Sequence, residues 1–117
     1  MIVVAETKAF QRNAGRLLSE REKEDLIYYL AEHLNSGTLI KDTGGIRKLR
    51  WAKSGRGKSG GIRAIYYYHN ELMPPYLLAA FGKNEKANLS QRERNDLAKG
   101  VKELVASWRK RNEQSIH

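Results

Sequence analysis

Three segments in the middle of the chain most constrain its fold, because each has the length, residue types and turn-rich borders of a β-strand. They cover residues 46–53, 62–69 and 76–81. The link over 54–61 is rich in glycine, and the link over 70–75 contains two consecutive prolines, so both are turns. Links this short join antiparallel neighbours, whereas parallel strands need a long crossover. The pattern therefore predicts an antiparallel meander.

A helix is predicted before this meander. Ser19 is followed three residues later by Glu22, the spacing of a capping box, in which each side chain accepts a backbone N–H of the other residue. An apolar stripe then recurs at helical spacing as far as Leu34. We expect this helix to end near 35–37, where Gly37 tolerates the left-handed conformation of a helix exit.

A second capping box, Ser90 with Glu93, predicts a C-terminal helix that continues to the cations at 109–111. Its apolar face consists of Leu97, Val101, Leu104, Val105 and Trp108. Residues 8–18 form a weaker helical pattern, and residues 2–7 are expected to form a short strand. Together these elements predict one α+β domain over 1–117, a small mostly antiparallel sheet with two or three helices packed on it.

Composition limits the environment and the chemistry. The chain has no cysteine, which excludes disulfides, Cys-ligated zinc and thiol nucleophiles, and suits a reducing compartment. It has no apolar stretch of membrane-spanning length, and its start, MIVVAETKAF, lacks the features of a signal peptide. We therefore expect a soluble cytoplasmic protein.

Positive charge is concentrated in the middle of the chain. The formal net charge is +9, and between residues 41 and 63 eight basic residues stand against Asp42 alone. The basic residues are Lys41, Arg47, Lys48, Arg50, Lys53, Arg56, Lys58 and Arg63. Since solvated surfaces usually mix both signs, this excess favours a nucleic-acid or phosphate-binding surface.

The stretch GRGKSGG, residues 55–61, has the spacing of a dinucleotide-binding loop and contains the Gly-Lys-Ser of a phosphate loop. Both motifs hold phosphate at a helix N-terminus, but the residues that follow here are typical of a strand. A phosphate loop also needs a glycine where this chain has Ala52. We interpret the stretch as a basic hairpin loop whose Arg56 and Lys58 contact a phosphate backbone, and we expect no cofactor.

Two further groups of side chains are candidates for chemistry. Alternation along the first strand directs Lys48 and Arg50 to the same face. Lys83 and Glu85 lie in the turn FGKNEKANL, at a strand end, where an adjoining base and acid fit either a site or an ordinary polar turn.

The aromatic residues allow two interpretations. Tyr66, Tyr67 and Tyr68 can stack on RNA bases, but alternation splits them between two faces, so at least one is expected in the core. Trp51 and Trp108 are expected to pack in the core. The histidines have no metal-ligand spacing, and we expect no metal site.

The phrases GGIRKLRWA, GKSGGIRAIYYY and LLAAFGKNEKANLS, with the order of the predicted elements, resemble the RelE superfamily of bacterial toxins, in particular its HigB-type branch. The resemblance covers nearly the whole chain and is strongest over 44–90. It implies a short antiparallel-rich sheet with helices on one side. It also implies a ribonuclease of a type II toxin–antitoxin module that enters the ribosomal A site, cuts messenger RNA and is neutralised by an antitoxin protein.

The resemblance also suggests functional positions. Two basic residues alternate along the family's corresponding strand, which matches Lys48 and Arg50, and the arginine that begins the next strand matches Arg63. The family's turn after the last core strand matches 82–85.

In that turn the chain departs from RelE itself. Asn84 stands where RelE has a second catalytic arginine, and Leu89 or Ser90 stands where RelE has a catalytic tyrosine. Lys83, Glu85 or one of the three tyrosines is a possible substitute.

The resulting hypothesis is a metal-independent endoribonuclease. Its candidate catalytic residues are Lys48, Arg50, Arg63, Lys83 and Glu85. Arg50 and Arg63 would hold the scissile phosphate, with Lys48 or Lys83 assisting and Glu85 as a possible base. The candidate RNA-binding residues are Arg47, Lys53, Arg56, Lys58 and Tyr67. The expected partners are an antitoxin, messenger RNA and the ribosome.

Two other function classes stay open. A ParE-type relative with the same fold poisons DNA gyrase, but would not need a converging cluster of lysine and arginine. A non-enzymatic RNA- or DNA-binding domain would explain the charge and the aromatic residues, but not the turn at 81–85.

Overall fold

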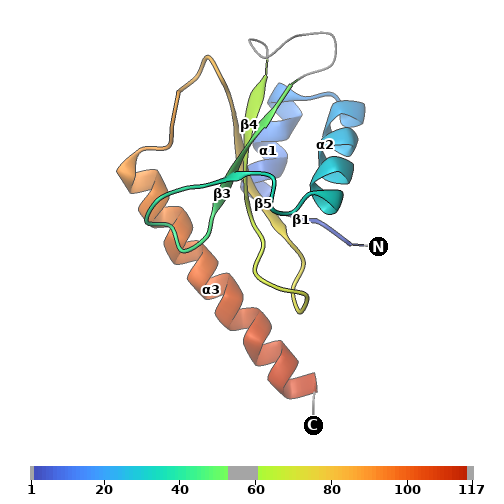
Figure 1. Ribbon diagram of the computed structural model, residues 1–117, viewed down its shortest axis with the longest axis vertical. Coiled ribbons are helices and arrows are strands. Elements are labelled where there is room, and N and C mark those ends of the chain that lie inside the picture. The colour runs from blue at the N-terminus through green and yellow to red at the C-terminus, as the bar shows by residue number, and fades with distance from the viewer. Residues whose placement is uncertain (1, 53–60, 116–117) are drawn as a thin grey trace.

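A computed structural model describes residues 2–52 and 61–115, which form three helices and one five-stranded sheet (Figure 1). The strands are β1 (Ala5–Glu6), β2 (Thr38–Leu39), β3 (Arg47–Trp51), β4 (Ile62–Tyr67) and β5 (Tyr76–Gly82), in the sheet order β1-β5-β4-β3-β2. The helices are α1 (Lys8–Leu17), α2 (Glu20–Glu32) and α3 (Gln91–Ser115). The predicted α+β class is confirmed.

The predicted meander forms the centre of the sheet, where β3 pairs antiparallel with β4 and β4 pairs antiparallel with β5. The two outer strands are short. β2, which the sequence did not predict, adds antiparallel to β3, and β1 adds parallel to β5. The predicted strand over 2–7 is reduced to β1. It ends before Thr7 because Thr7 caps α1, its hydroxyl accepting the Phe10 N–H at 3.1 Å.

Helices α1 and α2 cover one face of the sheet. Their buried residues include Phe10 and Leu26, which pack with Leu49, Ile62 and other strand residues in one core cluster. Burial of these side chains supplies most of the driving force for folding here. The weak helical pattern over 8–18 is thus a real helix, stabilised by its packing on the sheet.

The capping box of α2 is confirmed, since Ser19 and Glu22 exchange hydrogen bonds of 3.1 and 2.9 Å. The helix ends at Glu32, earlier than predicted. Gly37 does not adopt the expected left-handed exit conformation. Glycine is needed there for close approach instead, because a Cβ at this position would lie 2.8 Å from the buried Tyr66 ring.

Helix α3 packs on the opposite face of the sheet, so the sheet lies between helices rather than having them on one side (Figure 1). The physical reason is that the central strands carry apolar residues on both faces of the sheet, and each apolar face needs a helix to cover it. Ile65, Leu78 and Phe81 form a second core cluster, which Val101 of α3 completes. The capping box of Ser90 with Glu93 is confirmed, and the helix continues beyond the predicted cations to Ser115.

Candidate functional site

Lys48, Arg50 and Arg63 form a row of cations across β3 and β4, here called the cation row, on the sheet face against which α3 packs. Arg50 and Arg63 are register partners on these antiparallel strands, so their side chains leave the same face. Lys48 lies two residues before Arg50 and shares that face. Ile65, two residues after Arg63, packs in the cluster with α3 and thereby identifies the face. Alternation in the sequence predicted that Lys48 and Arg50 share one face of β3. The register between β3 and β4 adds Arg63 to that face.

The positive charge of this row is not neutralised within the described ranges. Neither Arg50 nor Arg63 has a carboxylate within the 4.0 Å of a salt bridge among residues 2–52 and 61–113. Arg63 makes one long hydrogen bond, 3.4 Å, to the neighbouring carbonyl of Ile62. Like charges directly opposite on adjacent strands destabilise a sheet, so an anion on this face would relieve their repulsion.

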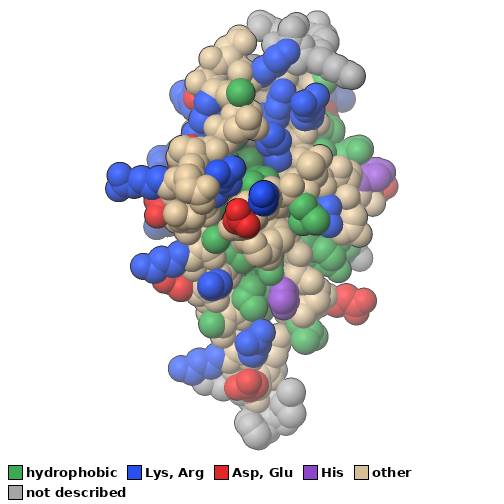
Figure 2. Space-filling view, turned by 60° about the vertical axis from the view of Figure 1, so that its left-hand side comes forward, with side chains coloured by type: hydrophobic (Ala, Val, Ile, Leu, Met, Phe, Trp, Pro, Cys, Tyr) green, Lys and Arg blue, Asp and Glu red, His purple; other side chains and the backbone are tan. Residues whose placement is uncertain are grey.

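The turn after β5 brings Lys83 to the same end of the sheet. Its backbone N–H donates to the Gly61 carbonyl at 3.3 Å, just before β4. Lys83, Arg50, Arg63 and Gly61 line one pocket together with Trp51 and Ala52. Figure 2 shows many Lys and Arg side chains in the upper part of this side of the molecule and few acidic ones. The tertiary structure therefore brings Arg50, Arg63 and Lys83 to one pocket at this end of the sheet, and Lys48 lies further along the same face of β3.

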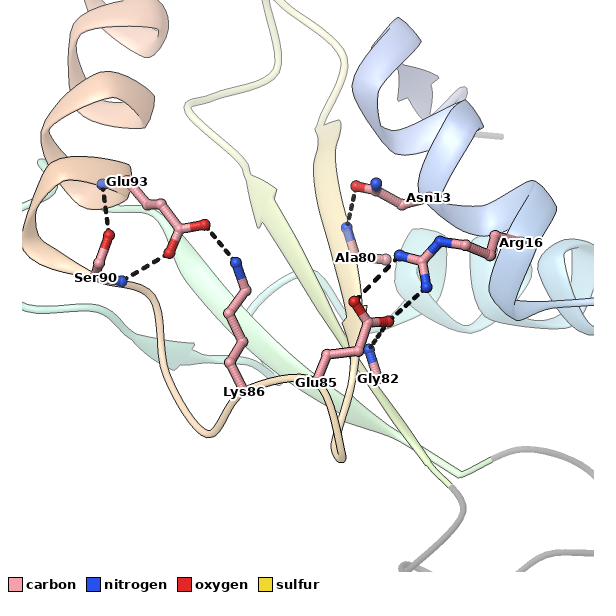
Figure 3. A network of polar contacts seen from close by, with 8 residues as sticks. All are labelled: Asn13, Arg16, Ala80, Gly82, Glu85, Lys86, Ser90 and Glu93. Atoms are coloured by element: carbon pink, nitrogen blue, oxygen red, sulfur yellow. Dashed lines mark hydrogen bonds and ion pairs between the residues drawn. The ribbon is translucent and has the colours of Figure 1, made fainter.

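Glu85, the fifth candidate, points toward α1 instead (Figure 3). Its carboxylate accepts two hydrogen bonds from the Arg16 guanidinium, at 2.7 and 3.2 Å, and one from the Gly82 N–H at 3.1 Å. These bonds, that of Arg16 foremost, lower the pKa of Glu85 below its usual value. A carboxylate held in this way is a weaker base, and its ion pair with Arg16 ties the turn to α1.

The other side of the same turn is attached to α3 (Figure 3). The Lys86 ammonium hydrogen bonds and ion pairs with Glu93, and it lies 5.1 Å from the centre of the Phe81 ring. The hydrogen bond from Lys86, together with that from the Ser90 N–H, lowers the pKa of Glu93. The turn between β5 and α3 is therefore fixed to α1 by one ion pair and to α3 by another.

The candidate RNA-binding residues do not all lie on the face of the cation row. The Arg47 guanidinium donates to the carbonyls of Asn35 and Gly37, at 3.3 and 2.7 Å, beyond the end of α2 and on the sheet face opposite Arg50. These hydrogen bonds tie β3 to the segment between α2 and β2. Lys53, Arg56 and Lys58 lie outside the described residues.

Of the three tyrosines, Tyr67 shares the face of the cation row, since it lies on β4 two residues after Ile65, the register partner of Lys48. Tyr66 is completely buried, and its hydroxyl donates to the Leu34 carbonyl and accepts the Gly37 N–H. Tyr67 is only 6% exposed, and burial raises the pKa of its hydroxyl. This burial argues against stacking of Tyr67 on an RNA base. Tyr68 lies beyond the end of β4, at the opposite end from Arg63.

Three contributors to the site were not predicted from the sequence. Arg16 and Lys86 fix the turn through partners that lie 69 and seven residues away. Asn88 accepts a hydrogen bond of 2.9 Å from the Lys48 ammonium, across 40 residues of sequence. Only the capping-box spacing of Ser90 and Glu93 indicated that this turn is ordered.

The described ranges contain no group of three or more His, Asp or Glu side chains arranged to hold a metal ion. Within the same ranges no helix has both the length and the apolar character to cross a membrane.

Comparison with protein families gives one match over almost the entire chain. Residues 3–117 match the model of a family described as the RelE toxin of the RelE/RelB toxin–antitoxin system.

Proposed function

The chain belongs to the RelE toxin family of toxin–antitoxin systems, and we propose that it is an endoribonuclease that cuts translated messenger RNA in the ribosomal A site. The observation that carries this proposal is the pair of opposed arginines, Arg50 and Arg63, with Lys48 on the same face and no carboxylate partner in the described ranges. This arrangement suits a phosphate that gains negative charge during a reaction.

The proposed reaction is attack of a ribose 2′-oxygen on the adjacent phosphorus. The O2′–P bond forms and the P–O5′ bond breaks, while a proton leaves the 2′-hydroxyl and another reaches the 5′-oxygen. Arg50 and Arg63 stabilise the doubly charged phosphorane by charge-assisted hydrogen bonds. Metal independence is part of the proposal, because the arginines supply this stabilisation themselves.

Lys48 and Lys83 are proposed to assist from the two sides of the arginine pair. Lys48 extends the row along β3, and Lys83 reaches the pocket from the turn after β5. Either ammonium can hold a non-bridging oxygen or donate a proton to the leaving oxygen. Glu85 is assigned a structural function rather than that of the base, since Arg16 and Gly82 occupy its carboxylate oxygens.

The partners follow from the same proposal. As a member of a toxin–antitoxin family the chain has an antitoxin protein as its partner. Messenger RNA and the ribosome are the proposed substrate and site of action, which also places the proposed activity in the cytoplasm. The basic face around Arg50 and Arg63 is the surface through which RNA would be bound.

The test is induction of the protein in cells without its antitoxin, followed by mapping of messenger 5′ ends and measurement of plasmid supercoiling. The proposal expects new 5′ ends within translated codons and unchanged supercoiling. Intact messenger with altered supercoiling would instead identify a gyrase inhibitor. Intact messenger with normal supercoiling, in cells whose growth is unaffected, would leave a non-enzymatic binding domain.

A further inference from the structure

One hydrogen bond joins the cation row to the segment before α3. The Lys48 ammonium donates to Asn88 Oδ1 at 2.9 Å. An ammonium group can only donate, so this contact fixes the amide with its oxygen toward Lys48 and its NH₂ group free to face elsewhere. Lys48 lies on β3, whereas Asn88 lies between β5 and α3, so folding alone brings them together.

The segment that carries Asn88 is held on both sides. The next residue, Leu89, is 8% exposed and packs in the cluster with α3. Ser90 and Glu93 close the capping box, and Lys86 is tied to Glu93 (Figure 3). Asn88 is therefore an exposed side chain on a fixed backbone, which is a suitable anchor for a long, flexible lysine.

The chemical type of this anchor matters as much as its position. A carboxylate at the same place would form an ion pair with Lys48 and cancel much of its charge toward a phosphate. An amide oxygen orients the ammonium but leaves its full positive charge. Lysine side chains lose considerable rotamer freedom when they are held in one place, so prior orientation lowers the cost of meeting the phosphate.

We infer that Asn88 is a positioning residue for the RNA-cleavage reaction, which holds Lys48 toward the scissile phosphate without neutralising it. This inference rests on the proposed ribonuclease activity. It assigns to Asn88 an effect on the rate of cutting that passes through Lys48 alone.

The experiment measures cleavage of a messenger on programmed ribosomes by the wild type and by Asn88→Ala, Asn88→Asp, Lys48→Ala and Lys48→Ala/Asn88→Ala. We expect Asn88→Ala to lower kcat roughly 10-fold with KM changed less than about 2-fold. Asn88→Asp keeps the hydrogen-bond acceptor and the shape of the side chain. We expect it to cut at least as slowly as Asn88→Ala, because its carboxylate neutralises Lys48. In the Lys48→Ala background, Asn88→Ala should have no further effect.

The control for added negative charge is Asn95→Asp, on the exposed side of α3, where the new carboxylate keeps the acceptor that Asn95 offers to Gln91. It should cut at the wild-type rate. Thermal unfolding of every variant separates a loss of fold from a loss of positioning.

Several outcomes would overturn the inference alone, with the wild type still cutting. These are wild-type rates for Asn88→Ala, recovery of the wild-type rate in Asn88→Asp, or an undiminished effect of Asn88→Ala when Lys48 is absent. A wild type that cuts no messenger at any codon would overturn the proposed function, and this inference with it.

Discussion

Arg50 and Arg63 are register partners on adjacent antiparallel strands, so two guanidinium side chains emerge side by side from one face of the sheet. The pair has no carboxylate within salt-bridge distance in the described part of the chain. A sheet gains nothing from such a pair, since like charges directly opposite each other repel. The pair becomes favourable when a phosphate binds between or above the two guanidinium groups.

Replacement of Arg63 by alanine should abolish most of the cleavage. Loss of one charge-assisted donor to the transition state typically lowers kcat by about 100- to 1,000-fold, and Arg50→Ala should act similarly. Single-turnover cleavage on programmed ribosomes measures the effect. The matched control is Arg21→Ala, an exposed arginine of α2 on the other side of the sheet. Full cleavage by Arg63→Ala would refute the assignment of the arginine pair.

Binding of single-stranded RNA should weaken as salt concentration rises, because bound phosphates release their counterions. Removal of either Arg50 or Arg63 should reduce the slope of log K against log salt by roughly 0.7 to 1. Fluorescence anisotropy at several potassium chloride concentrations gives these slopes. The same slope in Arg63→Ala as in the wild type would show that Arg63 does not contact phosphate, whatever its effect on the rate.

Glu85→Gln should change stability and its pH dependence more than catalysis. The pKa of Glu85 is lowered in the folded chain by Arg16, so the contribution of this pair is present above the ordinary carboxylate pKa and is lost as pH falls through the lowered one. Thermal unfolding should therefore show Glu85→Gln below the wild type in Tm at about pH 6, with the gap closing toward about pH 3.

Cleavage by Glu85→Gln at neutral pH should stay within about threefold of the wild type, since the structural function leaves the cation row in place. A loss of 100-fold or more in kcat, with Tm unchanged at that pH, would restore Glu85 as a candidate base.

Gly37→Ala should destabilise the fold by about 1 to 3 kcal/mol. The added methyl group would lie 2.8 Å from the Tyr66 ring, which is completely buried and tied by its hydroxyl to Gly37 and Leu34. Urea denaturation measures the change. The control is Gly15→Ala, in the last turn of α1, where a Cβ meets nothing within 4 Å. This variant should be more stable than the wild type by up to about 1 kcal/mol. Equal midpoints for both variants would contradict the close-approach argument.

Much of the fold could be predicted because its signals are local. The central strands and the two capping boxes depend on residues that are neighbours in sequence, and all of these were confirmed. The face shared by Lys48 and Arg50 follows from alternation alone. The short strand β2, the parallel pairing of β1 with β5 and the position of α3 on the second face were not predicted, because they depend on partners elsewhere in the chain.

The candidate site also has features that are local in the sequence and features that depend on distant residues. By itself the sequence determined a basic central region, two cations on one strand face and a polar turn after the last strand, since charge and alternation are properties of adjacent residues. Only the tertiary structure decided that Arg63 lies opposite Arg50, that Glu85 turns away to Arg16 and that Asn88 holds Lys48. The physical reason is that strand register and side-chain hydrogen bonds across 40 to 69 residues are set by packing on both faces of the sheet, which no local pattern encodes.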